Sequence, residues 1–146
     1  ANYAPTHKMT QPWIFKIFCN DSKKELLDEI IKNKNLSEHK KKKLENSFNK
    51  SSHIICICMK KNNDLLPEWE EIAATAMAVQ NLWISCVGSK IGGYWSTPKY
   101  INKLRKFLKL NVDEICLGFF YLGVHSSKKI NKKRRDNISE KIQWFR

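Results

Sequence analysis

The residues best suited to ligand binding lie in one short segment, GGYWSTP. Gly92 and Gly93 let the backbone come close to a ligand or to another part of the chain. Ser96 and Thr97 place hydroxyl groups beside the ring of Trp95. Backbone amides, hydroxyls and an aromatic wall could together hold a ligand, but the same residues also suit a purely structural turn. Spacing alone leaves both interpretations open.

Few residues suit acid–base or nucleophilic catalysis. His39, His53 and His125 have no partner at the spacing of a metal site or a catalytic triad. Glu70 and Glu71 fit the positive end of a helix dipole better than they fit an acid–base pair. The sequence therefore predicts no metal site and offers no clear catalytic side chain.

The cysteine pattern indicates a buried core in a reducing compartment. All five cysteines lie in or beside apolar runs, and Cys56 and Cys58 form a C-x-C within ICICM. A buried strand explains this spacing better than zinc or redox chemistry does. No apolar run is long enough to span a bilayer, and no signal peptide is visible. We therefore predict a cytoplasmic protein with no membrane partner.

The GGYWSTP segment must be positioned by a long apolar helix between Pro67 and Gly88. Pro67 suits the first helical position, the glutamates that follow suit the positive end of the dipole, and Gly88 suits a C-terminal cap. A helix that is apolar nearly all round is buried in a core or in an interface. The apolar residues at helical spacing are Trp69, Ile72, Ala73, Ala76, Met77, Trp83, Ile84 and Val87.

The rest of the pattern predicts a single α+β domain over residues 1–146. Strands are expected at 13–19, 53–59 and 116–122. Helices are expected at 23–32, at 38–48 and after Thr97, where Pro98 suits the first helical position. Because no internal repeat or linker is present, we predict one central sheet packed around the apolar helix.

The formal net charge of +13 is unevenly distributed. Residues 32–50 hold seven lysines against two glutamates, and residues 126–146 hold eight lysines and arginines against two acids. A basic nucleic-acid-binding module is one interpretation of these runs. Aromatic residues, however, occur in the apolar segments and not among the basic runs, where a stacking platform would need them. We therefore favour solvated faces and expect no specific nucleic-acid partner.

Three segments resemble the FMN-dependent nitroreductase family. The helix containing AATAMAVQN, followed by IGGYWS, resembles a branch that has a similar central helix and a glycine-containing Tyr-Trp-Ser segment. APTHKMTQPW is similar to that branch's Ala-Pro-x-His-Lys segment ending in Pro-Trp, and CLGFFYLG resembles its late core strand. The resemblance implies a nitroreductase-like α+β fold with a mixed or antiparallel sheet, and a flavoprotein oxidoreductase.

The resemblance also implies where FMN binds. The Thr6-His7-Lys8 loop matches one that contacts FMN, often from the neighbouring subunit of a dimer. Arg135 falls where the branch carries a basic residue for the FMN phosphate, and Arg134 or Lys133 would take this role if the register differs. Arginine suits a phosphate because its planar fork donates two hydrogen bonds. The implied FMN-binding residues are Tyr3, His7, Trp95, Ser96, Thr97 and Arg135.

The implied activity is transfer of electrons from NAD(P)H through FMN to an electron-poor small molecule such as a nitroaromatic or a quinone. The family forms homodimers with flavin sites at the subunit interface. Its N-terminal segment, which carries an Arg-Arg-Ser-type motif for the flavin phosphate, has no match here. We therefore expect a fragment lacking that segment or a divergent short form. The alternatives are a non-catalytic, degenerate family member and the basic nucleic-acid-binding module.

Overall fold

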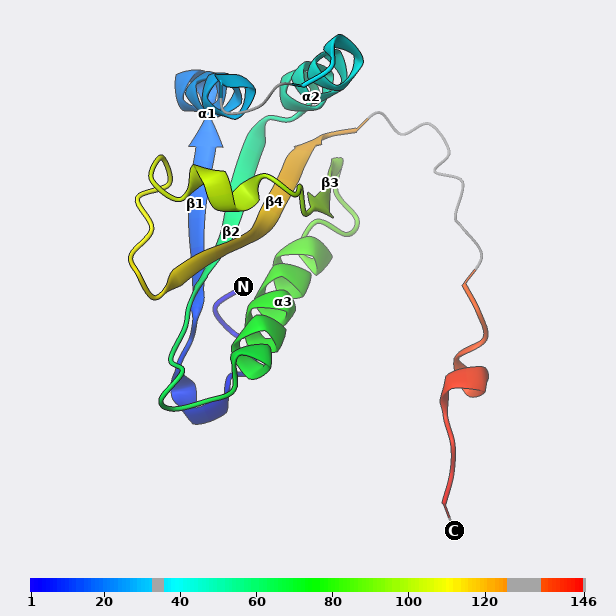
Figure 1. Ribbon diagram of the computed structural model, residues 1–146. Helices are drawn as coiled ribbons and strands as arrows, with labels where there is room; N and C mark the ends of the chain where they lie inside the picture. The colour runs from blue at the N-terminus through cyan, green and yellow to red at the C-terminus, as the bar shows by residue number, and fades with distance from the viewer. Residues whose placement is uncertain (33–35, 126–134, 146) are drawn as a thin grey trace.

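Four antiparallel strands form the sheet, in the order β1-β2-β4-β3 (Figure 1). The computed structural model describes residues 1–32, 36–125 and 135–145. The three predicted strands are confirmed, and the central pair is the most buried, as continuous apolar runs require. The bounds are β1 (Trp13–Cys19), β2 (His53–Lys60), β3 (Ile91–Ser96) and β4 (Glu114–Val124).

The glycine- and aromatic-rich segment, which was not predicted to be a strand, is the edge strand β3. It pairs with β4 from Ile91 opposite Val124 to Ser96 opposite Phe119. The glycines permit close approach, but to β4: a Cβ at Gly93 would clash with the carbonyl oxygen of Tyr121. Side chains along this segment therefore alternate between the two faces of the sheet, which a loop would not impose.

Helices cover the two faces of the sheet unequally. On one face, α1 (Asn20–Lys32), α2 (Glu38–Lys50) and the short 3-10 helix η2 (Ile101–Leu104) close a core around buried side chains such as Leu26, Phe48 and Phe119. On the other face, α3 (Glu68–Ile84) packs over a smaller cluster that contains Ile57 and Phe120. Each element is thus held to the sheet by apolar residues at its own structural period.

The apolar helix α3 forms as predicted, but it is buried on one side only. Ala74, Thr75, Ala78 and Val79 face the sheet and are buried. Trp69 is 66 % exposed and Ile84 is 55 % exposed on the other side. Ile72, Met77 and Trp83 are also exposed. This outer face is therefore not buried within a single chain, because one sheet covers only one side of a helix, and its burial in an interface stays a prediction.

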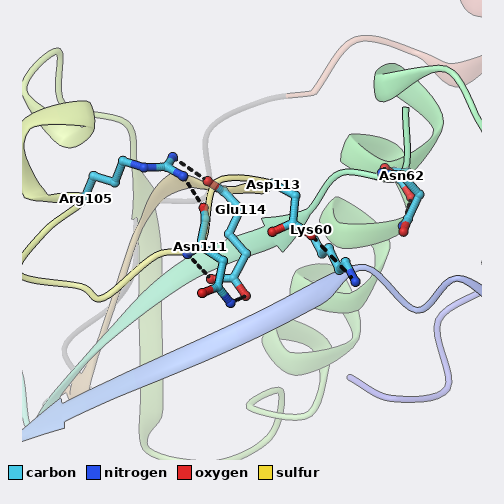
Figure 2. A network of polar contacts seen from close by, with 7 residues as sticks. Lys60, Asn62, Arg105, Asn111, Asp113 and Glu114 are labelled. Carbon is cyan, nitrogen blue, oxygen red and sulfur yellow. Dashed lines mark hydrogen bonds and ion pairs between the residues drawn. The ribbon is translucent and has the colours of Figure 1, made fainter. Parts of the chain in front are cut away.

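The predicted helix after Thr97 is also wrong, because only the four-residue turn η2 forms there. A polar network ends the turn and leads the chain into β4 (Figure 2). The Arg105 guanidinium donates to the backbone carbonyls of Asn111 and Glu114. The Glu114 carboxylate accepts from the backbone and side-chain nitrogens of Asn111, at 3.0 and 3.1 Å. Satisfying these polar groups in a compact turn competes with a regular helix.

A second buried carboxylate holds the loop before α3. Glu71 is 1 % exposed and accepts hydrogen bonds from the Asn62 backbone nitrogen at 2.8 Å and from the Asn62 side-chain nitrogen at 2.6 Å. Glu71→Leu should lower the free energy of unfolding by about 3 kcal/mol, since an orphaned buried donor costs about 1–3 kcal/mol. Urea denaturation measures this loss.

The matched control is Glu68→Gln in the same turn of α3. Glu68 is exposed and pairs with Lys61 at 3.1 Å, so its loss should cost at most about 1 kcal/mol. Equal urea midpoints for Glu71→Leu and Glu68→Gln would show that the buried carboxylate does not hold this loop.

Candidate functional site

The alternation of β3 directs Tyr94 and Ser96 to the face of the sheet that α2 covers. The Tyr94 ring stacks on Tyr121 of β4, with ring centroids 4.9 Å apart and an angle of 7° between the planes. Ser96 lines the same hollow as these two rings. Trp95 points to the opposite face and packs against Phe120 and its neighbours in the α3 cluster. The predicted segment therefore serves both faces of the sheet.

Two adjoining hollows lie between β3 and α2, with volumes of about 510 and 330 Å³. They share Ser47, Tyr94 and Tyr121, so they form one groove, which we call the β3–α2 groove. Gly123 keeps α2 close to the sheet, because a Cβ there would lie 2.9 Å from the Lys50 carbonyl oxygen. The groove is within the size range of small-molecule sites, about 300–1,000 Å³.

The β3–α2 groove is cationic above an aromatic floor. Lys40, Lys43 and Lys50 line it from α2, and His125 lines its far end. No carboxylate occurs among the described residues that line it. Burial, followed by the neighbouring Tyr100 and Tyr94 phenols, raises the pKa of Tyr121, so this phenol stays neutral. The groove therefore suits an anionic ligand that carries a flat ring.

His7 lies elsewhere, against the first turn of α3. Its ring nitrogen Nδ1 is 2.5 Å from the Glu70 carboxylate, beside an apolar hollow of about 420 Å³ that includes Trp69 and Met77. The loop after His7 is strained, because Lys8, Met9 and Gln11 adopt positive φ. In one chain His7 and the β3–α2 groove lie at opposite ends of α3 (Figure 1).

Comparison with known proteins decides the family. The sequence profile described as the nitroreductase family matches residues 1–124. The chain belongs to the nitroreductase family. It is 24 % identical over 151 residues to "Putative NAD(P)H nitroreductase YfhC" of Bacillus subtilis, covering 96 % of this chain and 78 % of that protein.

Solved nitroreductase structures share the fold. A nitroreductase-like family protein from Bacillus cereus superposes with a TM-score of 0.84 at 23 % identity, over 99 % of this chain and 79 % of that one. A nitroreductase with bound FMN from Bacteroides fragilis superposes with a TM-score of 0.66 at 17 % identity, over 99 % and 82 % of the two chains. The predicted α+β nitroreductase-like fold is thus confirmed, with a four-stranded antiparallel sheet.

The structure of this chain does not gather all the predicted FMN-binding residues. Ser96 lies in the β3–α2 groove, whereas Thr97 is exposed just beyond β3. Tyr3 is 98 % exposed near the chain's beginning. Arg135 is exposed in the segment 135–145, which stands apart from the sheet (Figure 1). Arg134 and Lys133 lie outside the described residues. The roles of these residues in binding FMN stay predictions.

The sequence did not single out Ser47, the lysines or the tyrosines of the groove. Tyr94 lies inside the GGYWSTP segment, but only the pairing of β3 with β4 shows that it faces α2. Four consecutive lysines begin at Lys40, and only the packing of α2 shows that Lys40 and Lys43 face the groove. Only the spacing of three residues between these two lysines indicated that they lie on one face of the helix.

Two buried cysteines of β2, Cys56 and Cys58, are held in their neutral form. A hydrogen bond with Cys116, followed by burial, raises the pKa values of the Cys56 and Cys58 thiols, so both stay protonated. Within the described ranges, no three histidine, cysteine, aspartate or glutamate side chains are arranged to hold a metal ion. Nor do those ranges contain a helix with the length and apolarity that crossing a membrane requires.

Proposed function

We propose that this chain is an FMN-dependent oxidoreductase that passes electrons from NAD(P)H to an electron-poor small molecule such as a nitroaromatic or a quinone. The observation that carries the proposal is the β3–α2 groove, in which cations surround a stacked tyrosine pair next to the predicted flavin-contacting residue Ser96. We also propose that it acts in the cytoplasm and has no sequence-specific nucleic-acid partner.

The groove residues fit the chemical groups of FMN. Lys40 and Lys43 supply positive charge for the phosphate, and the Tyr94–Tyr121 pair supplies a flat surface for the ring system. Ser47 and Ser96 supply hydroxyls for its polar edges. The cofactor, when bound, supplies the redox chemistry of hydride acceptance and electron transfer. The neutral Tyr121 phenol adds no negative charge near it.

A homodimer would complete this site. If two α3 helices pair antiparallel about a two-fold axis, the first turn of each lies beside the last turn of the other. His7 contacts Glu70 in the first turn, and Trp83 near the last turn lines the groove. Such a dimer would bring the partner's His7 towards the groove of this chain. The exposed apolar face of α3 supports this arrangement, since large exposed apolar patches mark interfaces.

The test is an FMN titration in which quenching of flavin fluorescence measures binding. Lys43→Ala should weaken FMN binding about tenfold to a hundredfold, because losing a charge-assisted contact costs about 1.5–3 kcal/mol. Tyr94→Ala should also weaken binding and shift the flavin absorption spectrum, whereas Tyr94→Phe should do neither. Lys24→Ala, an exposed lysine on α1, is the control for loss of charge.

Arg135→Ala in the same titration separates two phosphate sites. If it weakens binding while Lys43→Ala does not, the C-terminal segment holds the phosphate and the lysines of α2 do not. If the parent chain binds no FMN, the proposed function is wrong and a non-catalytic family member is the better account.

A further inference from the structure

A third hollow, of about 520 Å³, continues the β3–α2 groove onto the outer side of α2. His39, Lys42 and Asn46 line only this hollow. It shares Ser47 with both parts of the groove, Lys43 with the smaller part and Lys50 with the larger. We call this surface the basic ledge, defined by His39, Lys42, Lys43, Asn46, Ser47 and Lys50.

The ledge residues lie in one row along α2, and three of them, Lys42, Lys43 and Lys50, are lysines. Positions 39, 42, 43, 46 and 50 recur at helical spacing and span about 16 Å of helix at a rise of 1.5 Å per residue. None of the ion pairs among the described residues involves these lysines. No carboxylate lines the ledge within the same part of the chain. The row is therefore available to several anionic groups spaced along one ligand.

We propose that the basic ledge binds the phosphate groups of the dinucleotide electron donor and favours NADPH over NADH. The inference rests on the proposed function, since the nicotinamide must reach a flavin in the groove. A dinucleotide suits this layout because its ring can enter the groove while its phosphates stay outside. Of its three lysines, Lys43 is shared with the FMN phosphate, so Lys42 and Lys50 remain for the pyrophosphate and for the 2′-phosphate of NADPH.

The experiment measures binding of 2′,5′-ADP, which carries the 2′-phosphate, and of 5′-AMP, which lacks it. Calorimetry on the FMN-loaded protein gives both dissociation constants without depending on turnover. The parent should bind 2′,5′-ADP at least about tenfold more tightly than 5′-AMP. Lys42→Glu should remove most of that preference, because a cation that contacts the phosphate becomes a carboxylate, which repels the phosphate. Lys24→Glu on α1 makes the same charge change outside the ledge and should preserve it.

Two further measurements identify which idea fails. Lys42→Glu should leave FMN affinity within about twofold of the parent, because Lys42 lines the ledge and not the groove. Steady-state kinetics should show a KM for NADPH at least about tenfold higher in Lys42→Glu, with kcat unchanged. A parent that binds FMN but holds 2′,5′-ADP no more tightly than 5′-AMP overturns the ledge and leaves the proposed function standing. A parent that binds no FMN overturns both.

Discussion

Gly118→Ala should lower the free energy of unfolding by about 2–5 kcal/mol, combining an overpacking cost of about 1–3 kcal/mol with about 1–2 kcal/mol for positive φ. Gly118 lies in β4, opposite Ile57 at an irregularity in the pairing with β2, and its φ is +155°. A Cβ there would clash with the Trp95 indole nitrogen and lie 2.6 Å from the Ser96 carbonyl oxygen. The indole therefore occupies the space that any side chain at 118 would need.

The Trp95 ring cannot easily move away. It packs in the α3 cluster with Ile55 and Phe120, and its neighbour Ser96 faces the groove. The indole nitrogen is buried and has no hydrogen-bond partner within the described residues, so shape and not hydrogen bonding fixes the ring. Displacing it should shift β3 and weaken FMN binding as well as stability. Chemical denaturation and flavin titration of Gly118→Ala measure these two effects.

Gly88→Ala is the matched control for backbone strain. Gly88 has a φ of +82°, and a Cβ added there would meet no atom within 4 Å, so only the cost of positive φ remains, about 1–2 kcal/mol. Gly118→Ala combined with Trp95→Leu should cost less than the sum of the two single changes, because the smaller side chain relieves the clash. Equal losses of unfolding free energy for Gly118→Ala and Gly88→Ala would show that Trp95 does not exclude a side chain at residue 118.

The elements that were predicted correctly are those whose local hydrophobic pattern is long and regular. β2 and β4 are continuous apolar runs, and α3 has a long helical repeat, so local pattern was sufficient. β3 was not predicted as a strand, because two glycines in six residues weaken strand propensity and its pairing with β4 comes from a distant segment. A helix was predicted where only the short turn η2 forms, because helical spacing does not show that Arg105 and Glu114 hydrogen-bond within the turn that follows.

The candidate site shows the same division. Ser96 and Trp95 are neighbours in sequence and were predicted to act together, yet strand geometry sends them to opposite faces. Lys43 could not be distinguished from its three lysine neighbours until the packing of α2 was known. A helix that is apolar nearly all round can lie in a core or in an interface, and hydrophobic periodicity does not distinguish the two locations. That ambiguity now concerns the outer face of α3.

Met77→Asp should dissociate the proposed homodimer while leaving the single chain folded. Met77 is 39 % exposed on the outer face of α3, so a carboxylate there remains hydrated in a monomer. In a two-fold interface through α3 the same change occurs in both subunits and buries two like charges without partners. An unpaired buried charge costs about 3–5 kcal/mol, so the dimer dissociation constant should rise at least about a hundredfold. Sedimentation across a concentration series measures it.

Val112→Asp is the control, because Val112 is 95 % exposed on the turn before β4 and lies outside α3. It should leave the dissociation constant unchanged.

Met77→Asp should also weaken FMN binding if the partner's His7 completes the groove, and His7→Ala should weaken FMN binding without dissociating the dimer. Mixing a Lys43→Glu chain with a His7→Ala chain provides a stricter test. Each mixed dimer should contain one groove with both defects and one groove with neither, so part of the FMN binding should return. A parent that sediments as a folded monomer at all concentrations would contradict the dimer, and His7 would then have no route to the groove.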